Sequence, residues 1–459
     1  MNEHTTTIEI ENFGPIRRGD IELKPLTVFI GPNNSGKSCA AILIHSLYTA
    51  FHQILSFDIY FHIDQAEREK CVEIGGSFKT EDDIFREGNK EISVYRNEIT
   101  QIAEKLLTKR IRSEIENSYS TTLENIVRKT SKTFRIIVNQ NSRKLIIENS
   151  HDTVKVTEYP GLSEYPLDVK KIKHTISGHG EHRTLTLEFV DMLAALLREA
   201  AGEFIKKPYF LPSTRSGILQ VRKALTEDTW KQVLLSRMGS ERDAPKIPGV
   251  VSEFLLRIAE IPSRKGKFYE LACELEDEIL GEKIAVKNIE QYGYPEIEYT
   301  SRESFRPFHM VSSSGLELAP FILYLKYVIA PGDTVIIEEP ESHLHPENQS
   351  ILAKYLVRLI RNNVNLIITT HSELLLRKIS HFVLLGTVGE EKRVRKYGYR
   401  KDDFLLPEDV SVHVFNLDQE GGTIEKVKTK EGIMTSELLK AHESLYDETS
   451  ELLKDIESQ

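Results

Sequence analysis

The sequence predicts an α/β fold with a parallel core sheet, and two stretches of the chain carry this prediction. Near the N-terminus, the apolar run Leu26–Ile30 leads through a glycine-containing loop into a helical segment at 38–55. Further along, strand-like segments at 334–339 and 365–371 flank a helix at about 346–361. A strand, a helix and a second strand in succession usually pair their strands in parallel through a right-handed crossover.

The other segments predict how this core is interrupted and extended. Alternating residues at 7–30 predict strands, helical spacing appears at 92–130, and a β-hairpin pattern follows at 134–147. Residues 221–281 are typical of helices, and the tail has a few strands and a charged helix from about Met434. The predicted parts are the N-terminal core at 1–60, a helical and hairpin insertion at 61–200, the C-terminal core at 201–390 and an extension at 391–459.

Composition excludes several classes of protein. The 459 residues are 40% hydrophobic and 28% charged, which is typical of a globular protein. The net charge of -10 argues against a protein that coats nucleic acid over its whole surface. Three cysteines without a CxxC pair indicate reduced thiols. Neither a secretory signal nor an apolar run of the ~20 residues that a membrane span needs is found, so we expect a cytoplasmic protein with no membrane contact.

The loop after the first core strand carries the strongest motif. The residues "GPNNSGKS", Gly31 to Ser38, match G-x-x-x-x-G-K-[ST] between a strand and a helix, which favours a P-loop over a simple glycine turn. Its glycines let backbone N–H groups face a phosphate, Lys37 reaches the β- and γ-phosphates, and Ser38 ligates Mg²⁺. We therefore predict ATP and Mg²⁺ as ligands. The predicted nucleotide-binding residues are Gly31, Asn33, Asn34, Ser35, Gly36, Lys37 and Ser38.

Two later strands end in residues that suit the same chemistry. Glu338 and Glu339 close the strand "TVIIEE", where Glu338 would hold the metal and Glu339 would act as general base on the attacking water. The alternative is solvated surface charge. His371 ends the strand "NLIITTH" and is placed to sense the γ-phosphate, although a lone histidine is often structural.

A second phosphate site is predicted in "SSSGLELAPF", Ser312 to Phe321. Small residues at the start of an apolar helix leave N–H groups open to an anion. One nucleotide cannot obviously occupy both this turn and the P-loop of the same chain. We therefore expect a dimer or higher oligomer, in which each chain closes the site of the other.

In their order along the chain, these motifs resemble those of ABC-type P-loop ATPases of the SMC-like and OLD-like group. The similarity extends to the ATPases that pair with nucleases in anti-phage defence, such as the Septu type. It is carried by "ENFGPIRRGDIELKPLTVFIGPNNSGKS", "SSSG", "VIIEEPESHLHPENQ" and "ITTHSELLL". The resemblance implies an ABC-type ATPase head with a parallel core sheet and an antiparallel subsheet. The motifs are specific for the ATPase class and much less so for the biological system.

The resemblance also implies roles for individual residues. Ser313 and Gly315 would contact the γ-phosphate held by the partner's P-loop, residues 342–345 would line the dimer interface, and His371 would be the switch histidine. The chain departs from the pattern of transporters at Ser314, where they have glycine, and at Glu338 and His345, where they have aspartate.

Further residues stay open or are set aside. His343 and His345 have i, i+2 spacing without an evident third ligand, which argues against zinc. The glutamine loop is not recognisable. Arg215 and Gln220 either serve the active site or its regulation, or belong to a turn with surface polar groups. The tail after His371 lacks the Asp-x-Asp of a Toprim nuclease, so an effector would be supplied by another polypeptide.

Residues 105–144 are rich in basic side chains, which leaves two interpretations. The segment is either a DNA-facing arm, with nucleic acid as a partner, or a solvated helix face. The basic residues are Lys105, Lys109, Arg110, Arg112, Arg128, Lys129, Lys132, Arg135, Arg143 and Lys144.

Together these features predict an ATP-hydrolysing dimeric switch protein. The favoured role is the regulatory subunit of an anti-phage defence complex that controls a separate nuclease or toxin. One alternative is an SMC-like DNA-repair ATPase, which the lack of sustained heptads weakens. Another is a scaffold that binds ATP without hydrolysis, against which Glu339 argues. A transporter ATPase is the least favoured.

Overall fold

The computed structural model describes most of the chain outside the insertion. The described residues are 6–56, 90–127, 131, 133–140, 143–150, 153–159, 197, 201–224, 248–262, 264–288, 295–300, 305–306, 312–429 and 432–433. The chain forms two compact units. The first takes residues 1–22, 39–209 and 235–252, and the second takes 23–38, 210–234 and 253–459. The boundaries of the four parts expected from the sequence stay predictions.

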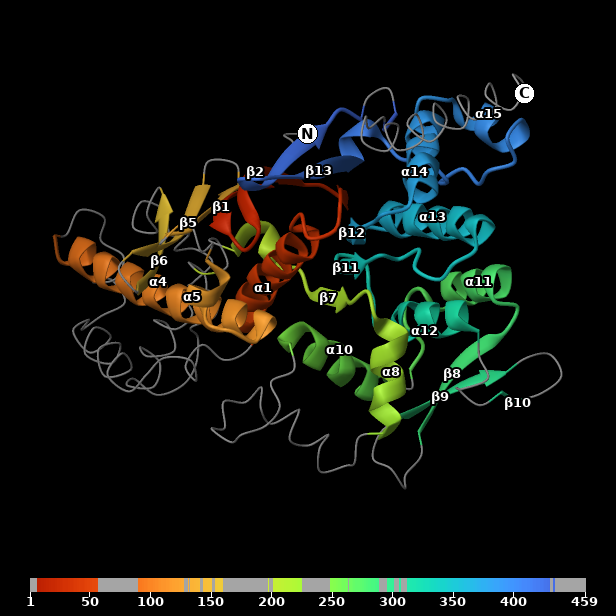
Figure 1. The fold of residues 1–459 in the computed structure, drawn as a ribbon, viewed down its shortest axis with the longest axis horizontal. Coiled ribbons are helices and arrows are strands. Elements are labelled where there is room, and N and C mark those ends of the chain that lie inside the picture. Colours follow the sequence, from red (N-terminus) through yellow and green to blue (C-terminus); the bar gives the residue numbers. More distant parts are fainter. Residues whose placement is uncertain are drawn as a thin grey trace, which may run out of the picture. The chain divides into compact units, whose positions relative to one another are not determined.

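The first unit is built on an antiparallel sheet. The strand order is β6-β5-β4-β1-β2, and β1 alternates buried and partly exposed residues, as strands of one-sided sheets do. A long helix, α4 (Lys90–Tyr119), lies along the β6 side of this sheet (Figure 1). The strands are β1 (Thr6–Phe13), β2 (Ile16–Leu23), β4 (Arg135–Gln140), β5 (Arg143–Ser150) and β6 (Thr153–Tyr159).

The predicted hairpin is confirmed and extends the N-terminal sheet. Strands β4 and β5 pair in antiparallel fashion, with Ile136 opposite Ile147. On its other edge β4 pairs with β1, and Val138 lies opposite Ile8. The hairpin is therefore part of the antiparallel sheet of this unit, a long-range pairing that the local pattern of the sequence did not reveal.

The second unit contains the parallel core. Its strands follow the order β14-β13-β3-β12-β11-β7, and β3 pairs in parallel with both β12 and β13. Strands β3 and β11 are buried along their whole length, as expected for strands covered on both faces. The α/β fold class with a parallel core and an antiparallel subsheet is confirmed. The strands are β3 (Leu26–Ile30), β7 (Pro208–Leu211), β11 (Thr334–Glu338), β12 (Asn365–Thr369), β13 (Val410–Asp418) and β14 (Gly421–Val427).

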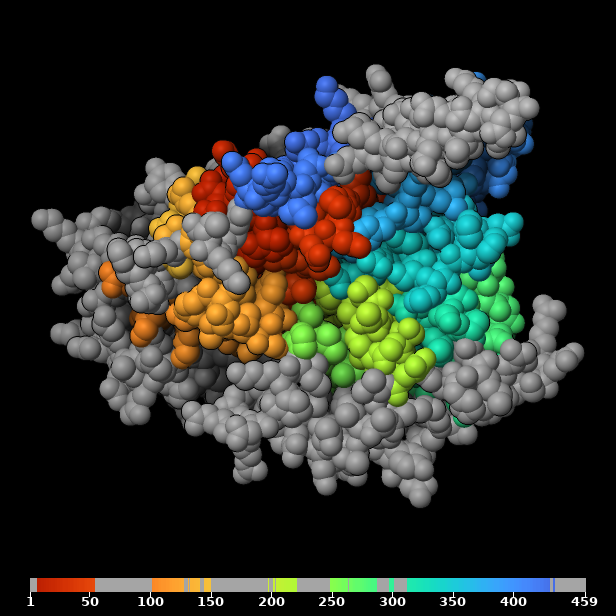
Figure 2. Space-filling model, viewed as in Figure 1, coloured from red at the N-terminus to blue at the C-terminus, as the bar shows by residue number. Residues whose placement is uncertain are grey.

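Helices surround this core, and a small sheet that the sequence did not predict accompanies them. Helices α11 and α13 pack against each other, and their surfaces adjoin in Figure 2. Glu278 of α11 accepts hydrogen bonds from Lys354 and Tyr355 of α13. The helices are α8 (Arg215–Ala224), α10 (Gly249–Ala259), α11 (Tyr269–Ile279), α12 (Ser313–Tyr327), α13 (Pro346–Arg361), α14 (Glu373–Gly386) and α15 (Glu390–Arg395). The small sheet consists of β8 (Lys283–Asn288), β9 (Pro295–Thr300) and β10 (Phe305–Arg306).

Two expectations remain to be placed. The helix expected from about Met434 lies outside the described residues. Among the helices that the structure describes, none combines the length and the apolar character that crossing a membrane requires.

Candidate nucleotide-binding site

The P-loop joins β3 to α1 (Lys37–Ser56), and its shape depends on residues that tolerate positive φ. Gly31 has φ +137°, Asn34 +62° and Gly36 +109°. Gly31 also lies against β13, where a Cβ atom would come within 2.2 Å of the carbonyl oxygen of Phe415. Because both the backbone angle and the close approach exclude a side chain, glycine is required at this position. The loop therefore leaves its backbone bare at the N-terminus of α1, as an anion site needs.

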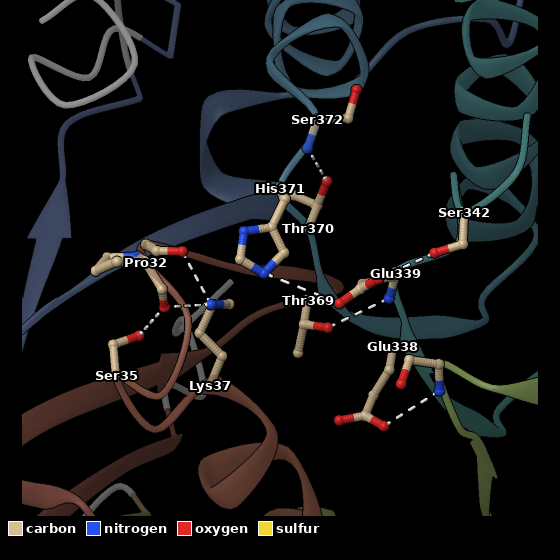
Figure 3. Close-up of polar contacts among 12 residues, drawn as sticks. Pro32, Ser35, Lys37, Glu338, Glu339, Ser342, Thr369, Thr370, His371 and Ser372 are labelled. Atoms are coloured by element: carbon tan, nitrogen blue, oxygen red, sulfur yellow. Dashed lines mark hydrogen bonds and ion pairs between the residues drawn. The ribbon is translucent and has the colours of Figure 1, made fainter. Parts of the chain in front are cut away.

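Lys37 lies buried at the start of α1, with its ammonium group inside the loop. Its Nζ donates to the carbonyl oxygens of Gly31 at 2.9 Å and Pro32 at 2.7 Å (Figure 3). Burial lowers the pKa of Lys37, whereas the nearby carboxylates of Glu339 and Glu338 raise it. An ionised phosphate is a stronger partner for an ammonium group than neutral carbonyls are. The lysine is thus already placed where a bound phosphate would engage it.

Glu338 is the last residue of β11 and is buried. Its Oε2 accepts from the N–H of Ser213 at 3.3 Å, and the Ser38 side chain lies near enough to lower its pKa. Burial is the larger influence, and it raises the pKa of Glu338. In the described part of the chain, its Oε1 has no hydrogen-bond partner. A buried carboxylate oxygen without a partner, close to a serine hydroxyl, fits a Mg²⁺ site.

The donor set also agrees with the way Mg²⁺ is usually held. This ion prefers oxygen ligands and often takes one or two side chains together with substrate phosphates and waters. Among the described residues, no group of three or more histidine, cysteine, aspartate or glutamate side chains is arranged to hold a metal. His343 and His345 are both exposed, and His345 occupies the N-cap position of α13.

Glu339 directly follows β11 and has an unusual backbone. Its φ is +44°, a region that costs a residue with a side chain roughly 1–3 kcal/mol. Its N–H donates to the carbonyl of Thr369 at 2.9 Å, and its Oε2 accepts from Ser342 Oγ at 3.0 Å. The carboxylate is only half-buried and lies between Ser342 and His371 (Figure 3). A carboxylate held in this way is able to accept a proton from a water molecule.

His371 follows β12 and approaches Glu339, with its Nε2 3.9 Å from Oε1 of that carboxylate. Burial and then the charge of Lys37 lower the pKa of His371, whereas Glu339 and Glu341 raise it. The predicted neighbours Lys37, Glu339 and His371 therefore meet at one end of the parallel strands. The imidazole faces both the cation and the carboxylate of the site (Figure 3).

Glu341 fixes the loop that carries His371, a role that the sequence analysis did not assign. Its buried Oε1 accepts from the Thr370 hydroxyl and from the N–H groups of His371 at 3.0 Å and Ser372 at 3.1 Å. Its place beside Glu338 and Glu339 in "EEPES" was the one signal available in the sequence. Contacts across about thirty residues are not visible in a local pattern.

The serine-rich turn at the start of α12 is a capped helix N-terminus. Ser312 Oγ accepts from the N–H of Gly315 at 3.1 Å and lies 3.2 Å from Ser314 Oγ. Ser313 is exposed at the first position of the helix, and Gly315 is buried. The turn thus presents Ser313 to the solvent, whereas in the P-loop Pro32, Asn33 and Asn34 are exposed and Lys37 is buried.

Arg215 and Gln220, whose roles the sequence left open, differ in their burial. Gln220 is exposed on α8. Arg215 is fully buried at the start of the same helix, and its guanidinium group binds the carbonyl oxygens of Glu338 and Glu339. The interpretation as a turn with surface polar groups is therefore wrong for Arg215.

The basic segment at 105–144 is partly neutralised by neighbouring acids. Arg110 pairs with Glu114, Arg112 with Glu116 and Glu124, and Arg135 with Glu148. Arg128, Lys129 and Lys132 lie outside the described residues. A role of this segment in nucleic-acid binding stays a prediction.

A family model decides the class of the protein. The model described as "AAA domain, putative AbiEii toxin, Type IV TA system" matches residues 26–377, more than half of the chain. The chain belongs to this AAA domain family. The matched span contains the P-loop, the start of α12, both carboxylates that end β11, and His371. Membership supports ATP binding by an ABC-type P-loop domain.

Solved structures with similar folds come from SMC heads. The "SMC head domain from Thermotoga maritima" covers 92% of this chain and 99% of its own, with 12% identity and a TM-score of 0.35. The "SmcHead bound to the C-winged helix domain of ScpA" covers 93% and 99%, with 10% identity and a TM-score of 0.41. The Smc head from Pyrococcus furiosus, bound to a domain of ScpA, covers 97% and 99%, with 12% identity and a TM-score of 0.37. No curated protein matches. With TM-scores this low, the family match remains the basis of the assignment.

Proposed function

We propose that this AAA domain protein is an ATP-hydrolysing dimeric switch, in which each nucleotide lies between the P-loop of one chain and the start of α12 of another. The observation that carries the proposal is the convergence of Lys37, Glu338, Glu339 and His371 at one end of the parallel sheet. Phosphoryl transfer from ATP to water uses a cation on the phosphates, a carboxylate that holds the metal and a base that activates water, and an imidazole can help to orient that water.

The roles of these residues follow from their positions. Lys37 would leave the loop carbonyls for the β- and γ-phosphates, and the N–H groups of the loop would bind the same oxygens. Ser38 and Glu338 would hold Mg²⁺, which supplies positive charge against the phosphates. Glu339 would take a proton from the attacking water, and His371 would orient that water or bind the γ-phosphate.

The second chain is proposed because the turn at α12 offers an exposed helix N-terminus that a phosphate from another chain could complete. Ser313 is exposed at a helix N-terminus, which attracts a phosphate through its N–H groups and dipole. Ser312 is engaged in capping this helix. A γ-phosphate held by the partner's P-loop would complete the site, and its release after hydrolysis would let the chains separate.

We further propose that the switch controls a separate effector in anti-phage defence. Support comes from the motifs shared with Septu-type ATPases and from the family description, which names a putative toxin of a type IV toxin–antitoxin system. In this proposal the effector is a nuclease or toxin on another polypeptide, and it responds to the nucleotide state of the ATPase. Deletion of the chain should abolish protection against phage, and the effector should co-purify with it.

The enzymatic part is tested by phosphate release and solution mass. Wild-type protein should release phosphate from ATP with Mg²⁺, and Glu339→Gln should lower the rate by roughly 10²–10⁴-fold, the usual contribution of a general base. Light scattering after size exclusion should show that Glu339→Gln doubles its mass, or compacts as a dimer, only with ATP and Mg²⁺. Lys37→Ala is the control that should not respond. Turnover by Glu339→Gln at the wild-type rate would contradict the mechanism.

A further inference from the structure

Arg215 joins the acidic strand end, formed by Glu338 and Glu339 at the end of β11, to helix α12 through a single buried side chain. On one side its Nη1 donates to the carbonyl oxygens of Glu338 at 2.6 Å and Pro212 at 3.1 Å. Its Nη2 donates to the carbonyl oxygen of Glu339 at 3.2 Å. The carbonyls of Glu338 and Glu339 belong to the peptide groups before and after the Glu339 Cα atom. Arg215 therefore fixes both backbone angles of Glu339, including the φ of +44°.

On the other side Arg215 binds Glu317, which lies in the second turn of α12. Nε donates to the backbone carbonyl of Glu317 at 3.2 Å, and Nη2 lies 3.1 Å from its Oε1 as an ion pair. Glu317 Oε2 accepts from the N–H of Ser216 at 3.0 Å. The side chains of Arg215 and Glu317 are each 2% exposed, so water does not weaken this contact.

The chemistry of this contact makes it rigid. A guanidinium group is planar, presents its donors in a fixed arrangement and stays protonated even when buried. Burial lowers the pKa of Arg215, and the carboxylate of Glu317 is the largest influence that raises it. A buried ion pair is favourable only when its geometry is maintained. A movement of α12 therefore has to displace the backbone that holds Glu339, or break the pair.

We propose that Arg215 is a positioning residue that couples α12 to the general base. When the N-terminus of α12 engages the nucleotide of a second chain, α12 would shift together with Glu317. Through Arg215, this shift would move the peptide groups on both sides of Glu339. The carboxylate would then be aligned only in the closed dimer, so that hydrolysis waits for assembly. This inference rests on the proposed shared site and adds a residue through which the two chains communicate.

The same helix offers a matched control. Lys326, in the last turn of α12, forms an equally buried ion pair with Glu276 at 2.7 Å and donates to the carbonyl of Ile284. These partners belong to α11 and β8, and neither is part of the acidic strand end. Glu276→Gln therefore removes the buried charge that pairs with Lys326 of α12, without touching the connection to Glu339.

The test compares Arg215→Lys and Glu317→Gln with Glu276→Gln. The first two should lower kcat at least tenfold while KM, nucleotide affinity and the ATP-dependent change in mass stay within twofold of wild type. Arg215→Lys keeps the positive charge, but one ammonium group cannot reproduce the contacts that the planar guanidinium group makes through several nitrogen atoms. Glu276→Gln should lower the melting temperature by a similar amount or more and leave kcat within twofold.

Hydrogen exchange gives a second readout that needs no turnover. Addition of ATP and Mg²⁺ to the Glu339→Gln background should increase protection of the peptide containing residues 338–344. Glu317→Gln in that background should abolish the increase, and Glu276→Gln should keep it. The inference is overturned if Glu317→Gln and Arg215→Lys retain wild-type kcat, or if all variants lose kcat in proportion to their stability. A wild-type protein without ATPase activity would instead overturn the proposed function, and the exchange data would still decide the coupling.

Discussion

The P-loop and the start of α12 are both helix N-termini made of small residues, yet they differ in what surrounds them. The P-loop holds the Lys37 ammonium and lies beside Glu338, Glu339 and His371. The turn at α12 exposes Ser313. The P-loop end thus carries the groups to which we assign phosphoryl transfer, whereas the α12 turn offers an exposed helix N-terminus for a phosphate. Because of this difference, the proposed mechanism needs two chains.

The largest expected effect distinguishes the P-loop from the α12 turn by substitution of one residue in each. Lys37→Ala should weaken ATP binding to the isolated chain roughly a hundredfold or more, because the charge-assisted contacts to the phosphates are lost. Ser313→Arg should leave that binding within about threefold and lower turnover roughly a hundredfold, because it blocks a contact made only in the closed dimer. Calorimetry with ATP and a phosphate-release assay measure the two quantities. Weakened binding in Ser313→Arg would place the α12 turn in the site of its own chain.

A second expectation concerns the shape of the P-loop. Gly31→Ala should lower the free energy of unfolding by at least about 3 kcal/mol, because strain at positive φ costs about 1–3 kcal/mol and a collision with the Phe415 carbonyl adds to it. Gly332→Ala is the control, since Gly332 has φ +96° but no atom within 4 Å of an added Cβ. Urea unfolding should show the larger loss for Gly31→Ala. Equal losses would mean that the contact with β13 is unimportant.

A smaller effect is expected where Glu341 holds the His371 loop. Glu341→Gln should lower kcat about tenfold with little change in nucleotide affinity, because hydrogen bonds to a charged acceptor contribute about 1.5–3 kcal/mol. Glu373→Gln is the matched control in the next helix, where the carboxylate forms an ion pair with the exposed Arg377. Steady-state kinetics of the two variants give the comparison. An unchanged kcat in Glu341→Gln would show that the loop is held by other contacts.

The smallest expected effect is a change in the titration of His371. Its pKa should lie below 6.5, so the stability that the neutral ring contributes is present above pH 6.5 and is lost as pH falls through the lowered pKa. Lys37→Ala should raise this pKa toward 6.5, because it removes the second cause of the shift. His381, whose pKa is lowered by burial and Lys378, should not respond. NMR titration with His371→Gln as the assignment control measures both rings.

How much of the fold and of the candidate site could be predicted depends on how far apart in the sequence the contacting residues lie. Lys37, Glu338, Glu339 and His371 each end or follow a strand within a local motif, so their convergence follows from the parallel pairing of β3, β11 and β12. The sequence left Arg215 open between an active-site role and a surface turn, because its partners Glu317, Glu338 and Glu339 lie 102 to 124 residues away. The left-handed backbone conformation of Glu339 was not predicted, because a glutamate residue does not favour positive φ.

The strands were predicted more securely than their partners. A tail strand was expected at Ser411–Leu417 and is found as β13 (Val410–Asp418), but its place beside β3 in the core depends on a contact with the opposite end of the chain. Likewise, the hairpin of β4 and β5 was visible in the alternation of residues, whereas its attachment to β1 was not. Local patterns specify elements, and burial of whole faces decides which elements meet.

The shared site is tested most directly by heterodimers with defined defects. Chains with different tags allow purification of a trans pair, Lys37→Ala with Ser313→Arg, and of a cis pair, wild type with the chain carrying both substitutions. In a shared site, the trans pair keeps one intact combination of P-loop and α12, whereas both sites of the cis pair contain a defect. We therefore expect single-turnover hydrolysis of ATP by the trans pair and none by the cis pair. Hydrolysis by the cis pair, with an inactive trans pair, would show that each chain completes its own site.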